Sequence, residues 1–409
     1  MKTKIFLGLF AFMLISFTGC EKNNDIMPEP IILQLNEKGQ KLVNSASDFG
    51  IDLFVKTVQS ETEKENLMIS PYSVSTALAM TYNGAGGNTK TAMGNTLNYD
   101  GLNDDEININ YKQLTDALLD LDPKVQLSVA NSIWYDNNFS VQQDFIDINK
   151  NFYNAEVSKL DFGNSASKDV INNWVAENTS NKIKQIIDKI DPDEVMFLIN
   201  AIYFKGQWKY KFDKSKNFNS TFFLADGTTR QVEMMGEELK LSKFGNELLS
   251  MIEMPFGRGN WAMDFILPKE GKKLDDVVNE LSATSLSSWL SSLSSPSSIQ
   301  VSLPPFKFEY SKKLNELLSQ MGMDIAFQPA LADFSGINPN EQLYISKVQH
   351  KTFIEVNEEG AEAAAATSVG MTFTSIGDGI IFNRPFMFLI RETTTGTILF
   401  IGKVENPVR

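Results

Sequence analysis

Apolar residues recur along this chain at two spacings, one typical of helices and one typical of strands. Helical spacing runs through Ser47–Ser60, Ser73–Tyr82 and Asp169–Asn181, and Ser70-Pro71 before the second of these is a helix-entry signal. Strand-like runs are found at Val125–Tyr135, Val195–Phe204, Leu248–Met254, Trp261–Leu267, Ile299–Leu303, Gln349–Val356 and Phe386–Ile390. Helices are concentrated in the first half and strands in the second, so the pattern predicts an α+β domain with large sheets.

One Ser-rich stretch, residues 282–298, allows two interpretations. Ten of its seventeen residues are Ser, which is typical of a disordered linker. Leu286, Trp289, Leu290 and Leu293 nevertheless fall at helical spacing. We therefore predict a surface helix with one buried face.

The segment Glu358–Ser375 combines two patterns. Taken in steps of two, one set is nearly all apolar (Ala361, Ala363, Ala365, Thr367, Val369, Met371) and the other is smaller and more polar (Glu362, Ala364, Ala366, Ser368, Gly370, Thr372). Period two is the period of a strand, so the first set could lie against a core. Ala and Gly are depleted in strands, however, and Asn357 before two Glu and an Ala-rich run is also a good helix start. The residues alone leave strand, helix and loop open.

The N-terminus has the features of an export signal. Lys2 and Lys4 precede the apolar run Ile5–Phe17, which is too short to span a membrane. The run ends in Thr18-Gly19-Cys20, which resembles the lipobox of bacterial lipoproteins, although Phe17 stands where an aliphatic residue is usual. We expect residues 1–19 to be removed and Cys20, the only Cys of the chain, to carry lipid.

This N-terminus implies a location and a domain organisation. Residues 20–35 read as a tether, with Pro28 and Pro30, and residues 36–409 as one globular domain. We expect an exported protein anchored by lipid to a bacterial outer membrane, at its periplasmic face or at the cell surface. The expected state is a monomer without disulfides.

Composition excludes several classes of function. A formal net charge of −14 argues against a nucleic-acid partner, because phosphate binding needs clustered Lys and Arg. His350 is the only His, which rules out a multi-His metal site and the HExxH motif. The chain has no GxSxG elbow, and no Cys remains for a thiol nucleophile. We expect neither a metal nor a cofactor.

Three further features could suggest enzymes but have simpler explanations. Gly84-Ala-Gly86-Gly87 follows a helix rather than a strand and is read as a helix-ending turn. Gly257-Arg-Gly259 is read as a hairpin turn between two strands. His350 could serve a Ser-His-Asp triad on count alone, but a lone His among apolar strand residues is more often a hydrogen-bonded core residue.

Four separated segments together resemble the serpin family, in the family's order and spacing, over roughly Leu42 to the C-terminus. They are Asn66–Met80 followed by Asn83–Thr89, Phe197–Trp208, His350–Glu358, and Phe382–Arg391 with Gly396–Pro407. The resemblance implies the serpin fold, with three β-sheets, about nine helices and an exposed reactive-centre loop. It also implies a protease inhibitor rather than an enzyme. The mechanism it implies is that the target cleaves the loop, the loop inserts as a new strand of the main sheet, and the protease is trapped as an acyl-enzyme.

The resemblance assigns a hinge to residues 358–367. These are Glu358, Glu359, Gly360, Ala361, Glu362, Ala363, Ala364, Ala365, Ala366 and Thr367. Alternate side chains must enter a packed core, so bulk or charge at Ala361, Ala363 or Ala365 would stall insertion. The family usually has Thr or Ser at the position of Ala361, a departure that could change the timing of insertion.

The resemblance also assigns two structural groups and a cleavage point. Ser70, Ser73, Asn200 and His350 match the shutter, a buried polar cluster where the main sheet opens, and Trp208 matches the breach, where the loop first enters. Family spacing puts the reactive bond between Thr374 and Ser375. Cleavage after Met371 or Phe373 stays open, because such loops tolerate register shifts.

The sequence therefore predicts an inhibitor of serine proteases, with papain-like cysteine proteases as a further candidate class. Elastase-like or subtilisin-like targets suit cleavage after Thr374, and chymotrypsin-like targets suit Met371 or Phe373. A non-inhibitory serpin-fold binding or carrier protein is the main alternative. A glycan-binding surface lipoprotein is a third, supported only by the lipobox and the aromatic content.

Overall fold

The computed structural model describes residues 29–191, 194–361 and 379–407. Over these residues the chain forms nine α-helices: α1 (Glu37–Ser60), α2 (Pro71–Tyr82), α3 (Gly87–Thr96), α4 (Asp104–Leu119), α5 (Gln143–Tyr153), α6 (Ser167–Asn178), α7 (Leu274–Glu280), α8 (Ala283–Ser291) and α9 (Asn315–Leu318). Three short helical turns accompany them: η1 (Lys214–Lys216), η2 (Ser319–Met323) and η3 (Asp324–Phe327). None of the helices in the described part of the chain is both long enough and apolar enough to cross a membrane.

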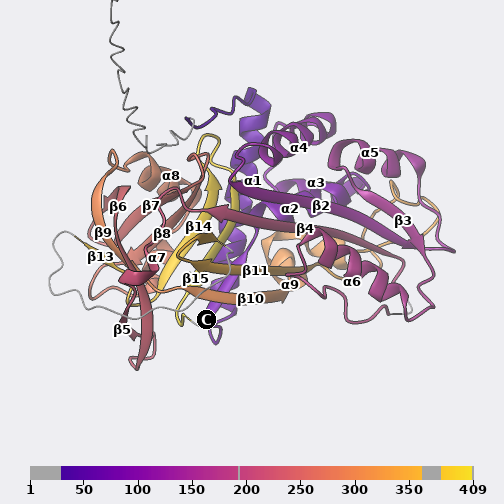
Figure 1. Cartoon of the computed structure of the whole chain (residues 1–409). Coiled ribbons are helices and arrows are strands. Elements are labelled where there is room, and N and C mark those ends of the chain that lie inside the picture. Colours follow the sequence, from indigo (N-terminus) through magenta and orange to yellow (C-terminus); the bar gives the residue numbers. More distant parts are fainter. Residues whose placement is uncertain (1–28, 192–193, 362–378, 408–409) are drawn as a thin grey trace, which may run out of the picture.

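Six strands form the main sheet, which crosses the molecule in Figure 1. In spatial order they are β10 (Phe306–Lys313), β11 (Gln349–Asn357), β12 (Gly360–Ala361), β4 (Met196–Gln207), β2 (Val125–Asp136) and β3 (Glu156–Leu160). Two of its pairings, β12 with β4 and β4 with β2, join strands that are not consecutive along the chain, so the sheet brings distant segments together. Asn131 of β2, for example, lies opposite Asn200 of β4.

Nine strands form a second hydrogen-bonded network. In spatial order they are β1 (Asn66–Ile69), β15 (Ile398–Val404), β14 (Phe386–Glu392), β8 (Trp261–Pro268), β7 (Leu249–Phe256), β6 (Thr229–Gly245), β9 (Ser297–Leu303) and β13 (Ile380–Ile381), with β5 (Phe218–Phe223) paired to β6. The 17-residue strand β6 pairs with β7 through one part and with β5 and β9 through another. It thus joins two of the three expected sheets.

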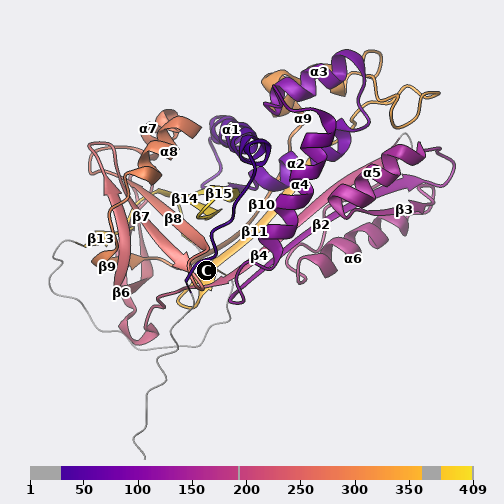
Figure 2. The same cartoon turned by 90° about the horizontal axis from the view of Figure 1, so that it is seen from above.

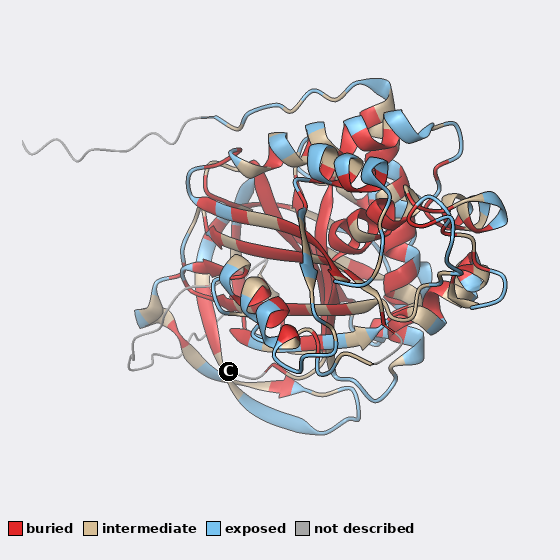
Figure 3. Cartoon of the chain, turned by 90° about the vertical axis from the view of Figure 1, so that its right-hand side faces the viewer, coloured by how far each residue is buried: buried red, intermediate tan, exposed pale blue. Residues whose placement is uncertain are grey.

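Helices cover both faces of the main sheet (Figure 2). Along β4, Phe197, Ile199 and Ala201 belong to a small core with Ile171 and Val175 of α6. The alternate residues Ile202 and Phe204 of β4 belong to the large core that contains α1 and α2. This alternation is the period of two that the sequence shows, and Figure 3 shows the buried residues gathered between the layers.

Helix α2 begins where the sequence predicts a helix entry. The Ser70 hydroxyl accepts a hydrogen bond from the Ser73 N–H at 3.2 Å, and Pro71 occupies the first turn, where its missing N–H costs nothing. Nearly every residue of the helix is buried, because it lies between the main sheet and β15. The α+β class is confirmed, and each strand-like run overlaps an observed strand.

The Ser-rich stretch is helical only in its first half. Helix α8 ends at Ser291 and buries Leu286 and Trp289, as predicted. The expected continuation through Leu293 to Ser298 is wrong, because β9 begins at Ser297. There Ser297 and Ser298 pair with the middle of β6, and the sheet supplies the backbone hydrogen bonds that a longer helix would have made.

Candidate functional site

The main sheet has a position between β4 and β11 that is filled only at one end. The two-residue strand β12 pairs with both neighbours: Ala361 lies opposite Gly206 of β4 and Val356 of β11. In the described part of the chain, β4 and β11 do not pair directly as strands, and β12 alone pairs with both. Of the expected hinge, Gly360 and Ala361 are therefore strand rather than helix, and Ala361 is buried as the alternation predicts.

Gly360 passes unusually close to β4. Its φ is +152°, and a Cβ atom added there would lie 1.9 Å from the carbonyl oxygen of Gly206. No side chain fits at that distance, so the hinge can lie this close to β4 only with glycine at this position.

The turn before β12 is held by the segment that follows β4. The carbonyl of Glu358 accepts a hydrogen bond from the Phe212 N–H at 3.1 Å, and the carbonyl of Glu359 accepts one from the Trp208 N–H at 2.9 Å. The buried Glu358 carboxylate accepts a hydrogen bond from Asn217 Nδ2 at 2.6 Å, while Glu359 forms an exposed ion pair with Lys211. These contacts hold Glu358 and Glu359, the first two residues of the expected hinge, against the segment that follows β4.

Trp208, the predicted breach residue, fills the corner where β12 enters the sheet. Its ring is 2 % exposed and stacks on Phe256 with centroids 4.4 Å apart and planes 8° apart. Its Nε1–H donates to the Asn357 carbonyl at 2.9 Å. The contact joins the end of β11 to the end of β4, on either side of β12.

The structure brings together all four predicted shutter residues. The Ser70 N–H donates to His350 Nε2 at 3.0 Å, and the Ser73 hydroxyl donates to Asn200 Oδ1. Asn200 Nδ2 in turn donates to Asn131 Oδ1 at 2.6 Å. The cluster connects α2, β4 and β11, which border the unfilled position.

Sequence reasoning missed Asn131. It lies in a run otherwise dominated by apolar and small residues, and it is buried opposite Asn200. A polar amide inside a strand-like run could have marked it, but its partner is 69 residues away along the chain, and only the sheet register joins the two.

Burial determines the protonation state of His350. Loss of hydration lowers its pKa from 6.5 to about 4, so the ring is neutral near pH 7. Its Nε2 accepts a hydrogen bond from a backbone N–H, which makes it a structural acceptor. It does not hold the Ser70 hydroxyl as the base of a catalytic triad would.

A cavity of about 390 Å³ lies below the unfilled position. Met196, Leu198 and Asn200, alternate residues of β4, line one side, and Val348 and His350 line the other. The polar shutter thus lies at one edge of a hollow between β4 and β11 that is lined by both polar and apolar side chains.

Several predicted residues lie outside the described part of the chain. They are Cys20, hinge residues Glu362 to Thr367, Met371, Phe373, Thr374 and Ser375. Within the described ranges, no three His, Cys, Asp or Glu side chains are close enough to hold a metal ion.

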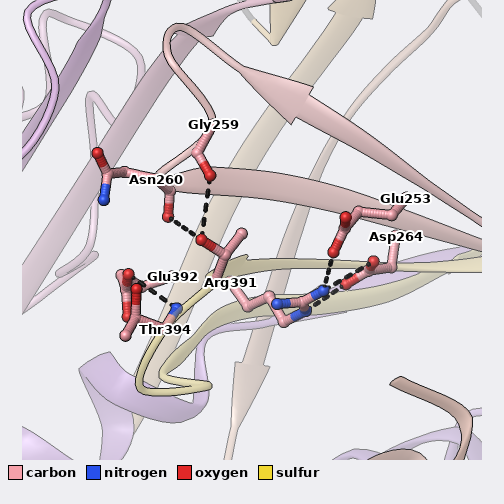
Figure 4. Close-up of polar contacts among 8 residues, drawn as sticks. Glu253, Gly259, Asn260, Asp264, Arg391, Glu392 and Thr394 are labelled. Atoms are coloured by element: carbon pink, nitrogen blue, oxygen red, sulfur yellow. Dashed lines mark hydrogen bonds and ion pairs between the residues drawn. The ribbon is translucent and has the colours of Figure 1, made fainter. Parts of the chain in front are cut away.

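A second buried polar group lies in the other sheet network (Figure 4). Arg391 of β14 pairs with Asp264 of β8 at 2.7 Å and with Glu253 of β7. Burial raises the pKa of Asp264 to about 6, against the lowering effect of the Arg391 charge. This group supports three adjacent strands and is not part of the β4–β11 site.

Comparison with known proteins gives one family. The family model described as serpin (serine protease inhibitor) matches residues 44–407. An uncharacterised serpin-like protein of Methanosarcina mazei is 33 % identical over 99 % of this chain and 98 % of its own length. Antithrombin-III of Mus musculus is 34 % identical over 91 % of this chain and 83 % of its own length.

Two solved structures are similar throughout. The thermophilic serpin tengpin in its native state is 34 % identical, with a TM-score of 0.81 over 93 % of this chain and 98 % of the other. Thyroxine-binding globulin in complex with thyroxine is 31 % identical, with a TM-score of 0.82 over 90 % of this chain and 100 % of the other.

Proposed function

Because the chain belongs to the serpin family, we propose that it inhibits serine proteases as a suicide substrate, by inserting its cleaved loop between β4 and β11. The observation that carries the proposal is that β12 already occupies the first two places of this position, while β4 and β11 have no other pairing to each other in the described residues.

The register of β12 supports insertion of the whole hinge. Continued without a shift, it puts Ala363 between Phe204 and Ile354, and Thr367 between Asn200 and His350. The side chains of these four residues of β4 and β11 face the core side of the sheet. A packed position of this kind accepts small, uncharged side chains, and the inward residues of the hinge are small and uncharged.

Further along, the same register reaches the cavity. Val369 and Met371 would lie beside Leu198 and Met196, which line it. Insertion would therefore add main-chain pairing on two sides and would pack Val369 and Met371 against these two apolar side chains, and both effects lower the free energy of the inserted state. This difference would drive the displacement of the protease.

The proposed reaction begins as ordinary proteolysis. The serine oxygen of the protease attacks the carbonyl carbon of Thr374, the bond to Ser375 breaks, and the Ser375 nitrogen leaves as a protonated amine. Thr374 stays bound to the protease as an ester. Fourteen inserted residues would carry this ester about 46 Å, at ~3.3 Å per residue, before water can hydrolyse it.

A denaturing gel tests the proposal. The protein is mixed with elastase-like, subtilisin-like, chymotrypsin-like and papain-like proteases. Inhibition predicts a covalent complex that resists the denaturant, with the summed mass of the two proteins less that of the C-terminal peptide, which the denaturant releases. Mass spectrometry of that peptide locates the cleaved bond. If every protease cuts the loop and none is retained, trapping is wrong.

A non-inhibitory carrier is the second candidate, and the similarity to thyroxine-binding globulin, solved with bound thyroxine, favours it. Thermal unfolding of the intact and loop-cleaved protein separates the two. A cleaved form no more stable than the intact one favours the carrier, since the loop then does not insert.

We also propose lipid attachment at Cys20, on the lipobox resemblance. Membrane fractions of a host that expresses the full chain should contain the protein. Replacing Cys20 with Ala should release it to the soluble fraction, and a variant that stays in the membrane fraction contradicts the proposal.

A further inference from the structure

The segment that precedes α1, Glu29–Asn36, lies along the body, and we call it the strap. Its residues Leu33 and Leu35 pack against the large core, whereas Ile31 and Ile32 are 46 % and 72 % exposed. Ile32 is the most exposed of the large apolar residues in the described ranges. The strap therefore holds two consecutive isoleucines outside the core.

A buried amide fixes the strap at Ile31. Asn260, in the turn between β7 and β8, is fully buried, and its Oδ1 accepts a hydrogen bond from the Ile31 N–H at 3.0 Å. Its Nδ2 donates to the Ile31 carbonyl at 2.6 Å. In the same turn, a Cβ atom added to Gly259 would lie 3.4 Å from Cγ of Pro30. The two isoleucines thus belong to a docked segment, and these contacts hold them at the surface.

Two cations lie beside the strap. The Arg258 Nε–H donates at 3.0 Å to the amide oxygen that also binds the strap, and the Lys209 ammonium donates to the Arg258 carbonyl at 3.2 Å. The acidic groups next to them are the buried Asp122, whose carboxylate accepts the Arg258 N–H at 2.8 Å, and Glu29 at the start of the strap. These four charges sum to zero in a chain whose net charge is −14, so this end of the body approaches an anionic surface more readily than the rest.

The chain before the strap is short. Glu29 is nine residues after Cys20, and nine residues span at most about 30 Å when fully extended. A lipid on Cys20 therefore keeps the strap close to the membrane, and this proximity raises the effective concentration of a weak contact. The length of the tether thus favours a lipid surface over a soluble partner.

We propose that the strap and the turn beside it form a second membrane contact, with Ile31 and Ile32 among the lipid headgroups and Lys209 and Arg258 against their phosphates. The inference rests on the proposed lipid attachment at Cys20. Apolar side chains enter the headgroup region favourably, and each Lys or Arg near an anionic bilayer adds attraction.

This contact also orients the site of loop insertion. Gly360 of the hinge pairs with Gln207, and the Gln207 carbonyl accepts a hydrogen bond from the Gly257 N–H at 2.8 Å. Gly257 belongs to the same turn as Asn260. The hinge therefore begins at the membrane-facing end of the body, and insertion along β4 carries a trapped protease away from the membrane.

Fluorescence of the lipidated chain in vesicles that contain phosphatidylglycerol tests the contact. With Cys20 modified by lipid, Ile32→Cys supplies the only free thiol for an environment-sensitive probe. Its emission should shift to shorter wavelength and should be quenched by brominated lipid. Val170→Cys is the matched control, since Val170 is 45 % exposed in α6, which covers the opposite face of the main sheet from α1 (Figure 1). That probe should show neither change.

Binding of the unlipidated chain from Cys20 onward, which keeps every described residue, measures the strap alone. Ile31→Ser combined with Ile32→Ser should weaken its cosedimentation with these vesicles about tenfold. Lys209→Gln should weaken it about fivefold, and only where the vesicles contain phosphatidylglycerol. Lys168→Gln, in α6, is the control and should change nothing.

The readouts separate this inference from the proposed attachment. If the mass of the purified chain shows no lipid on Cys20, the attachment fails, yet a tenfold loss with the two Ser substitutions still supports the strap as a membrane contact.

Two results would overturn the inference. One is a probe at residue 32 that vesicles neither shift nor quench although Cys20 carries lipid. The other is binding of soluble polyphosphate that Lys209→Gln weakens, with no binding of the unlipidated chain to vesicles, which would assign this surface to a soluble polyanion.

Discussion

At Gly360 the hinge passes closer to β4 than a side chain permits. Gly360→Ala should lower the free energy of unfolding by about 2–4 kcal/mol, because the backbone must move away from Gly206 and β12 must loosen. Denaturant titration measures this loss. Gly227→Ala is the matched control, since Gly227 also has positive φ (+85°) but has no atom within 4 Å of an added Cβ. Its cost should be only the backbone strain, about 1 kcal/mol. Equal losses would contradict the close-approach argument.

The alternation of the hinge makes a sharper residue-scale prediction. Ala363→Glu puts a charge on the set that must enter the core, whereas Ala364→Glu puts the same charge on the outward set. We expect the first variant to be cleaved without trapping, since burying an unpaired carboxylate stalls insertion. The second should still form the covalent complex. Gels of both variants with one protease measure this, and trapping by Ala363→Glu would disprove the proposed register.

At the scale of elements, the shutter ties the first turn of α2 to β4 and, beyond it, β2. Asn200→Ala should cost about 2 kcal/mol of unfolding free energy, because the buried Ser73 hydroxyl and Asn131 amide lose their partner. It should also speed conversion to a form that no longer traps protease, since β4 and β11 separate more easily. Incubation followed by a trapping assay checks this. Asn219→Ala, at an exposed position of β5, is the control. If Asn200→Ala has the unfolding free energy and the conversion rate of wild type, the cluster does not stabilise the sheet.

At the scale of the whole molecule, two buried groups in different sheets oppose each other as the pH changes. His350 has a pKa lowered to about 4, so the folded state binds fewer protons than the unfolded state, and stability is lost as the pH falls from 6.5 to 4. Asp264 has a pKa raised to about 6, so its protonated form favours folding, and stability is lost as the pH rises from 3.8 to 6. Each effect amounts to about 3 kcal/mol, so the two largely cancel.

Variants should expose this cancellation. Unfolding free energies at pH 4 and pH 6.5 are compared for wild type, Asp264→Asn and His350→Gln. Asp264→Asn should lose more stability on acidification than wild type, because only the His350 effect remains. His350→Gln should lose less. Parallel profiles for all three proteins would rule out both shifts.

The sequence predicted much of this architecture because local rules decide it. Runs of alternating or continuous apolar residues became strands, and Ser70-Pro71 began a helix, since capping and proline geometry act over a few residues. The end of the Ser-rich helix was wrong because the competing strand pairs with a segment more than fifty residues earlier in the chain. Asn131 was missed for the same reason.

What the sequence by itself determined is the alternation of residues 361–367, with a small and uncharged inward set (Ala361, Ala363, Ala365, Thr367), and with it the kind of strand this segment could become. It left helix and strand open, because an Ala-rich segment has no strong local preference for pairing. Only the tertiary structure decided that Gly360 and Ala361 lie as a strand between β4 and β11, at the opposite end of this position from a cavity edged by His350 and Asn200. The physical reason is that a strand exists only where neighbours supply its hydrogen bonds, and the neighbours of Ala361 are 155 and five residues away along the chain.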